Sequence, residues 1–169
     1  VSPSGVITTV AGSEQGFSGD GGSATAAKFN FPSDVYLDNA GSMYIADRNN
    51  HRIRRIDLTT GVVTTVAGTG QAGFAGDGGP ATQAQLNDPF RVLLDKNGDL
   101  VFTDRANQRV RKITRSTGVI TTVAGNGSRG GDPSRSFADP AGLAMTADGT
   151  VYVTDGAWSY LRRLVPAGT

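Results

Sequence analysis

The sequence predicts an all-β protein that is built from repeated four-stranded antiparallel sheets. Glycine occupies 24 of the 169 positions, roughly twice its usual share, which indicates many tight turns. Short runs of β-branched and aromatic residues lie between these turns, and no run has the length or the 3.6-residue period of an α-helix. One segment, Gly-Val-Ile/Val-Thr-Thr-Val-Ala-Gly, recurs at residues 5–12, 61–68 and 118–125. A recurrence at this spacing indicates a repeat fold.

Each repeat is expected to contribute four strands. A hairpin turn whose residues tolerate positive φ separates the first strand from the second, and a glycine turn leads from the third strand into the Val-Thr-rich fourth strand. The first three strands are expected, copy by copy, at 34–38, 43–47 and 52–57, at 91–95, 100–104 and 109–114, and at 142–146, 151–155 and 160–165.

Four short antiparallel strands per repeat, stacked radially, describe the blade of a β-propeller. Blades are expected at about 33–67, about 90–124 and about 141–165. Closed propellers typically have 4–8 blades, so three blades cannot close a ring of that kind.

The strand count predicts how the ring closes. The third copy lacks a fourth strand, and the segment Val6–Val10 is a spare fourth strand at the start of the sequence. We therefore expect a six-bladed homodimer in which Val6–Val10 of each chain pairs beside Tyr160–Val165 of the other. The alternative is a fragment of a longer natural chain, and the two interpretations are compatible because a fragment can dimerise.

The segment Tyr44–Arg54, with Pro32 before it and Gly-Val-Val-Thr-Thr-Val-Ala-Gly after it, resembles an NHL repeat. The resemblance covers nearly the whole chain and implies a six-bladed propeller. The Gly-Asp-Gly-Gly linkers resemble those of bacterial, often exported, NHL propellers, which implies an extracellular or periplasmic location. The resemblance leaves the role open, since some members of the family bind proteins, some bind RNA and a few are lyases or hydrolases.

Composition excludes several classes of site. The chain has no Cys, which excludes disulfides and thiolate chemistry, and its one His excludes a three-His zinc site within one chain. A net charge of +1 gives no bulk attraction to nucleic acid, and no apolar run approaches the length of a membrane helix. We therefore expect no cofactor, no membrane association and no nucleic-acid partner.

Four residues break the repeat and are the candidates for ligand binding. Asp34 and Arg91 stand at the entry to the central channel, where the third copy has Gly142. They are expected either to form a salt bridge or to line a site for a polar small molecule. Trp158 and Tyr160 replace polar residues of a loop and are expected either to anchor a partner or to pack under the shortened third linker.

Two acid–arginine pairs recur in register and are assigned to the structural motif. Asp47 with Arg52, and Asp104 with Arg109, have the same offset in two copies. They could present a ring of charge to a ligand, but recurrence favours a staple in which the carboxylate closes the turn against the arginine.

The remaining candidates concern metals and catalysis. Asp20 and Asp77 lie in glycine-rich linkers, where they are weak candidates for Ca²⁺ and more typical of Asx turns. If the protein is an enzyme, His51 with Arg48 and Arg105 is the set to inspect.

The lone His, the absence of Cys and the uniformity of the repeats favour a non-catalytic role. The sequence therefore predicts an interaction scaffold that dimerises and binds a protein or small ligand on its loop face. The alternative is a propeller lyase or hydrolase that acts at the mouth of the channel.

Overall fold

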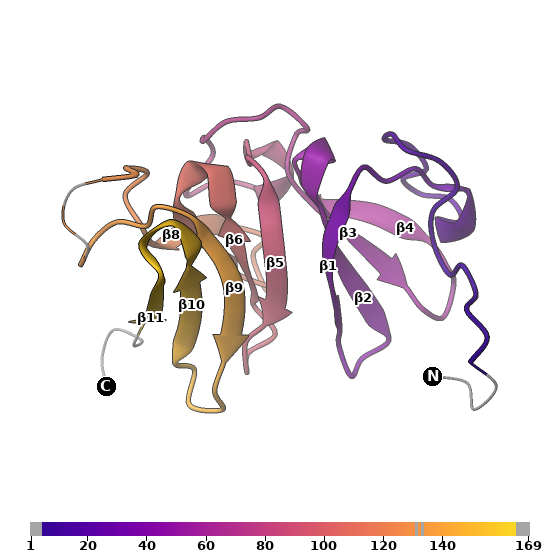
Figure 1. The fold of residues 1–169 in the computed structure, drawn as a ribbon. Coiled ribbons are helices and arrows are strands. Elements are labelled where there is room, and N and C mark those ends of the chain that lie inside the picture. Colours follow the sequence, from indigo (N-terminus) through magenta and orange to yellow (C-terminus); the bar gives the residue numbers. More distant parts are fainter. Residues whose placement is uncertain (1–4, 131, 133, 165–169) are drawn as a thin grey trace.

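The computed structural model describes residues 5–130, 132 and 134–164, and its strands form three antiparallel sheets that follow one another in an arc (Figure 1). Blade 1 contains β1 (Pro32–Leu37), β2 (Ser42–Asp47), β3 (Arg52–Asp57) and β4 (Val63–Ala67). Blade 2 contains β5 (Pro89–Leu94), β6 (Leu100–Asp104), β7 (Arg109–Ile113) and β8 (Ile120–Ala124). Blade 3 contains β9 (Pro140–Met145), β10 (Val151–Asp155) and β11 (Tyr160–Leu164). The predicted all-β class with three repeated sheets is confirmed.

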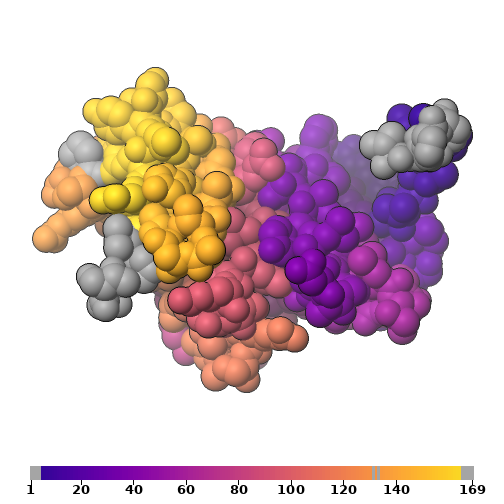
Figure 2. All heavy atoms as spheres, turned by 90° about the horizontal axis from the view of Figure 1, so that it is seen from below, coloured from indigo at the N-terminus to yellow at the C-terminus, as the bar shows by residue number. Residues whose placement is uncertain are grey.

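The first strand of each blade is the innermost strand. β5 lies between β1 and β9, and each blade continues outward from there in sequence order. Figure 2 shows the molecule from below, where the hairpins between first and second strands lie, and the three blades follow one another there without interruption. No helix in the described part of the chain is long and apolar enough to span a bilayer.

One face of the arc, at the top in Figure 1, carries the turns between the second and third strands of all three blades. We call it the turn face. These turns are the 3-10 helices η2 (Arg48–Asn50), η4 (Arg105–Asn107) and η5 (Gly156–Trp158). Each ends in a residue with left-handed backbone, so the chain reverses within one turn of helix. The innermost strands begin at the same face, so the turn face also carries their first residues (Figure 1).

The linkers cover the blade that follows them. The first linker contains η1 (Ala24–Ala26) and the second contains η3 (Ala81–Gln83). The second linker also meets the preceding blade, because a Cβ at Gly68 would lie 2.2 Å from the carbonyl oxygen of His51. Only glycine fits at this contact, where φ is also +93°.

Apolar side chains fill the spaces between blades. The cluster between blades 1 and 2 includes Ile53 from β3, Leu86 from the second linker, and Val92 and Phe102 from blade 2. A second interblade cluster contains Val110 and Val153 with other side chains of blades 2 and 3. Burying each such large side chain contributes about 1.5–3 kcal/mol, so the blades hold one another in place.

The two ends of the arc expose side chains whose counterparts inside it are buried. Val35 of β1 is 55% exposed, whereas Val92 at the same place in blade 2 is 4% exposed. Leu161 of β11 is 70% exposed, whereas Ile53 and Val110 are fully buried. Within one chain, each end therefore lacks a neighbouring blade.

The segment 5–10 is not a strand in the single chain, although the sequence predicts one there. It makes no ladder, and Ile7 is 97% exposed. The equivalent segments pair with the third strand of their own blades, as β4 and β8 do. Within the part of the chain that the structure describes, residues 5–10 have no third strand beside them and β11 has no fourth strand. The predicted end of that third strand, Val165, lies outside the described residues.

Candidate functional site on the turn face

A fully buried aspartate ends the second strand of each blade. Asp104 accepts hydrogen bonds from the backbone N–H of Asn87 and the side-chain amide of Asn107, both at 2.7 Å. Asp47 has the same pattern. Each carboxylate therefore ties its linker to its turn. Burial raises the pKa of Asp47, and it raises the pKa of Asp104 to about 6.

The charged partners of these carboxylates differ from those expected from the sequence. Asp47 pairs with Arg54, not with Arg52, and the Nη1–Oδ2 distance is 3.3 Å. Although Arg52 lies opposite Asp47 in the β2–β3 register, its guanidinium turns toward the next linker. There it donates to the carbonyl oxygen of Thr69 at 2.6 Å. The proposed staple is thus a link between a blade and the following linker.

Blade 2 has the same arrangement of carboxylate and arginines. Asp104 pairs with Arg111 at 3.3 Å, while Arg109 donates to the carbonyl oxygen of Asn126 at 3.0 Å. Arg54 and Arg111 are the largest fully buried side chains of the described residues. Sequence analysis did not single out either arginine, although their recurrence in register with Asp20 and Asp77 was a signal of burial.

Asp20 and Asp77 are the second carboxylates of these buried clusters. Asp20 accepts from Arg54 at 2.9 Å and from the Thr65 hydroxyl at 2.7 Å. Asp77 accepts from Arg111 at 2.7 Å. Neither a local Asx turn nor a calcium ligand set describes this geometry, and the described residues contain no group of three or more acids or histidines placed for a metal ion.

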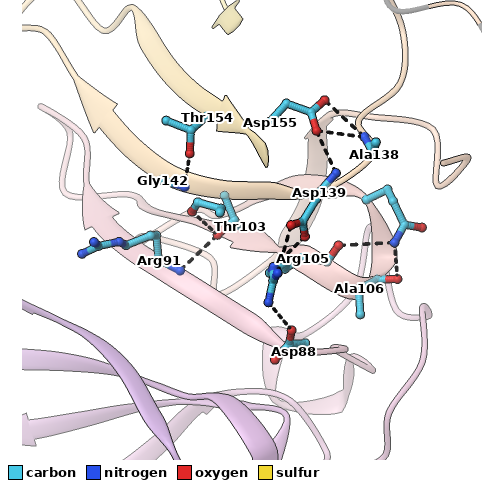
Figure 3. Close-up of polar contacts among 12 residues, drawn as sticks. Asp88, Arg91, Thr103, Arg105, Ala106, Ala138, Asp139, Gly142, Thr154 and Asp155 are labelled. Atoms are coloured by element: carbon cyan, nitrogen blue, oxygen red, sulfur yellow. Dashed lines mark hydrogen bonds and ion pairs between the residues drawn. The ribbon is translucent and has the colours of Figure 1, made fainter. Parts of the chain in front are cut away.

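A ladder of ion pairs crosses the turn face from blade to blade, and Figure 3 shows the part that joins Asp88, Arg105 and Asp139. Arg48 of blade 1 pairs with Asp88, which immediately precedes β5. Arg105 lies within 3.4 Å of Asp88 and donates to Asp139, immediately before β9, at 2.6 Å. Phe90 lies between the two arginines, with guanidinium-to-ring distances of 5.6 and 5.1 Å. Sequence analysis singled out the arginines but missed both acids, because they are not part of the motif that repeats in all three copies.

Asp34 and Arg91 form the salt bridge that is one of their two expected outcomes. Arg91 Nη1 lies 2.7 Å from Asp34 Oδ1, and Asp34 Oδ2 accepts the backbone N–H of Val92 at 2.9 Å. The Arg91 side chain remains 47% exposed. The pair therefore joins the first two innermost strands and leaves nearly half of the Arg91 side chain exposed.

His51 has a structural position. It ends η2 with φ of 52°, and its Nδ1 accepts the backbone N–H of Asp88 at 3.3 Å. Burial lowers the pKa of His51; the Asp88 carboxylate opposes this effect and Arg52 adds to it. The neutral imidazole is the form that accepts this hydrogen bond. His51 and Arg48 contact Asp88 from blade 1, whereas Arg105 contacts it from within blade 2.

Trp158 and Tyr160 surround the arginine of blade 3. Arg162 lies 5.7 Å from the Trp158 ring and 5.5 Å from the Tyr160 ring. In blade 1 the corresponding Arg54 lies 4.8 Å from the ring of Phe17, which belongs to the longer first linker. Two rings of blade 3 thus lie near Arg162, as the Phe17 ring lies near Arg54 in blade 1, and Tyr160 remains 50% exposed.

The acidic side chains of the turn face are held in ion pairs. Within the described residues, its acids Asp34, Asp88 and Asp139 are each ion-paired with arginine. The imidazole of His51 contacts a backbone N–H rather than a hydroxyl nucleophile. Such a face offers fixed charge and aromatic surface instead of an activated nucleophile.

Comparisons with known proteins agree with this fold. The family model described as NHL repeat matches residues 29–56. The chain is 29% identical over 154 residues to Protein SUPPRESSOR OF QUENCHING 1, chloroplastic, of Arabidopsis thaliana, which covers 85% of this chain and 15% of that protein. It is 28% identical over 163 residues to NHL repeat-containing protein 2 of Bos taurus, covering 80% of this chain and 22% of that protein.

A solved structure shares this fold. A protein of Bacteroides thetaiotaomicron VPI-5482 superposes with a TM-score of 0.65 at 27% identity, covering 83% of this chain and 35% of the other. The chain thus spans less than a quarter of the length of the two curated relatives and about a third of this solved chain.

Proposed function

The chain is an NHL-repeat protein, and from this premise we propose that it is a non-catalytic interaction scaffold whose ring is completed by a second copy. In this assembly two arcs of three blades form a six-bladed ring. The turn face then becomes a continuous surface around the channel mouth, where a protein or small ligand binds. The observation that carries the proposal is the exposure of apolar positions at both ends of the arc.

The open side of blade 1 holds half of an interblade core. Phe29, Ile45, Ile56 and Val63 cluster there. Their counterparts in blade 2 belong to the interblade cluster to which blade 1 contributes Ile53. In repeat order the residue of blade 3 that matches Ile53 is Leu161, which is 70% exposed. A blade 3 placed beside blade 1 would therefore bury Leu161 in the position that Ile53 occupies.

Strand exchange supplies the missing fourth strand of blade 3. An open strand edge with exposed apolar residues is a template for pairing with another chain. The β3–β4 register pairs Arg55 with Thr64 and Ile56 with Val63. Applied to β11 of blade 3, this register places Thr8 of the partner's segment opposite Arg163. Ile7, which is 97% exposed, then lies opposite Leu164.

The turn face supports binding rather than catalysis. The ladder that joins Arg48, Asp88, Arg105 and Asp139 fixes the turns of neighbouring blades relative to one another. Arg91 keeps nearly half of its side chain open beside it. A rigid surface of this kind loses little conformational freedom when a ligand binds.

Light scattering on a size-exclusion column tests the assembly. The proposal requires a species of twice the 17.4 kDa chain mass that persists at micromolar concentration. A folded species of the single-chain mass over the whole concentration range would contradict it. Circular dichroism on the same fractions separates a folded monomer from an unfolded one.

A further inference from the structure

We propose that the seam between the two copies is specified by paired replacements, so that blade 3 of one chain selects blade 1 of a second copy. This inference rests on the proposed two-copy ring and identifies what makes its partner specific. At two places the two surfaces that would meet at the seam differ together from the surfaces that meet inside the arc. A third contact, between a hydroxyl and a carbonyl, is conserved in type.

The first replacement removes a charge pair. Inside the arc an arginine that begins a turn reaches an acid immediately before the next innermost strand, as Arg48 reaches Asp88 and Arg105 reaches Asp139. At the open ends the same two places hold Gly156 in blade 3 and Phe31 before blade 1. Arginine and acid are therefore both absent, and joining the ends leaves no unpaired charge. The small glycine also leaves room for the phenylalanine.

Phe31 has the geometry of a contact residue without a partner. It is 62% exposed, and its φ is 51°, close to the 58° of Asp88 at the same place in blade 2. Phenylalanine rarely adopts this backbone conformation, which aspartate tolerates better. Phe31 also lines an open groove on blade 1. The groove is formed by residues 11–15, Phe29, Phe31 and Pro32.

The second replacement concerns the residue that begins the third strand of a blade and the linker residue that it covers in the next blade. Inside the arc, Arg52 lies so close over Gly70 that a Cβ there would be 2.1 Å from its Nη1, and Arg109 covers Gly127 in the same way. Blade 3 has Tyr160 at the arginine position. The first linker correspondingly has Ser-Glu-Gln at 13–15, with no glycine beneath an arginine. Both members of the contact have again changed together.

The third contact keeps its chemistry. Thr103 donates its hydroxyl to the carbonyl oxygen of Ala141 across the second junction at 3.2 Å. Ser33 donates to the carbonyl oxygen of Phe90 across the first junction at 2.8 Å. At the open end Thr154 matches Thr103, and the carbonyl of Ser33 matches that of Ala141. Thr154 is exposed, and its hydroxyl accepts the backbone N–H of Gly142 at 2.7 Å, which leaves its hydrogen for a partner.

These features favour a second copy over an unrelated blade. A blade with the usual acid before its innermost strand would place that carboxylate against Gly156, where no arginine answers it. A blade with the usual arginine would bring its guanidinium to Phe31, where the acid that pairs with it inside the arc is absent. Complementarity of charge and volume is satisfied when the two ends belong to copies of this chain.

Analytical ultracentrifugation of four variants tests the seam. Phe31→Asp and Gly156→Arg are each expected to weaken the dimer at least about tenfold. The double variant restores the Arg–Asp pair of the internal junctions and is expected to recover affinity to within about threefold of the original chain. Leu58→Asp alters an exposed leucine in the β3–β4 turn and serves as the control.

Folding does not confound the result. Aspartate at position 31 suits the left-handed backbone better than phenylalanine. A Cβ at Gly156 meets nothing closer than an Asp139 carboxylate oxygen at 3.4 Å. Single variants that dimerise as tightly as the Leu58 control would overturn the seam while leaving the two-copy ring intact. A monomeric original chain would overturn the ring and the seam with it.

Discussion

The buried guanidinium of Arg111 is predicted to be one of the strongest single determinants of stability in blade 2. The change to examine is Arg111→Met, which keeps an unbranched side chain of similar length but removes every donor. Arg111 donates to the carbonyl oxygens of Gln85 and Ala75 at 2.9 and 3.1 Å, and to Asp77 and Asp104 at 2.7 and 3.3 Å. The variant removes the arginine donor from all four acceptors.

The magnitude follows from burial. Asp104 is fully buried, and removing one partner of a buried ion pair costs about 3–5 kcal/mol. Asp77 keeps a third of its side chain exposed, so water replaces much of its lost contact. The Gln85 carbonyl adds about 1–3 kcal/mol where water cannot reach it, whereas the Ala75 carbonyl keeps the backbone N–H of Gln85 at 3.2 Å. We expect a loss of about 4 kcal/mol or more, a large part of the 5–15 kcal/mol typical of a folded domain.

The assay is urea unfolding followed by circular dichroism at fixed protein concentration, with Lys96→Met as the control. Lys96 is an exposed residue of the same blade, so its replacement should change stability by less than about 0.5 kcal/mol. The Arg111 variant should lose about 2 M in midpoint for a slope near 2 kcal/mol per molar urea. Its deficit should also shrink toward acidic pH, because protonating Asp104 removes the unpaired charge. A loss below about 1 kcal/mol would refute the reasoning.

Three further predictions concern single groups. The one histidine, His51, should titrate below 6.5 by NMR; since its neutral form is favoured in the fold, stability should fall as pH drops below 6.5, and His51→Gln should abolish that dependence. Burial alone would raise the pKa of Asp77, but contacts from Thr122 and Arg111 outweigh burial and lower that pKa. The stabilisation that the Asp77 carboxylate gives the fold should therefore be lost as pH falls below about 3.8. Asp77→Asn should remove this acid sensitivity in urea titrations. Asp34→Asn should cost about 0.5–1.5 kcal/mol by thermal unfolding, since the salt bridge is partly exposed and the amide oxygen still accepts from the backbone; no change would mean that the pair does not join the blades.

The fold could be predicted because its signals are local and repeated. The Val-Thr-rich segment and the glycine turns specify strands through propensity and backbone conformation, and they recur in all three copies. The segment 6–10 shows the limit of this reasoning. Its composition matches β4, yet a strand forms only where a neighbour supplies hydrogen-bond partners, and propensity does not provide that neighbour.

The candidate site could be predicted only in part. The salt bridge between Asp34 and Arg91 follows from opposite charges at the same place in adjacent repeats. The partners of Asp47 could not be found by offset alone, because Arg52 and Arg54 point to the same side of β3 and only packing decides which one is buried. Asp88 and Asp139 were missed since their role is to bridge blades, and that role is visible only when the repeats are placed side by side.

Covalent trapping in the expected register tests ring closure most directly. The chain has no cysteine, so Thr8→Cys with Arg163→Cys introduces two thiols and no others. If a second chain completes the circle, mild oxidation should convert this double variant to species of twice the chain mass on non-reducing gels, and a pair moved one residue out of register should react far less. Persistent single chains, or equal trapping of both pairs, would contradict the account.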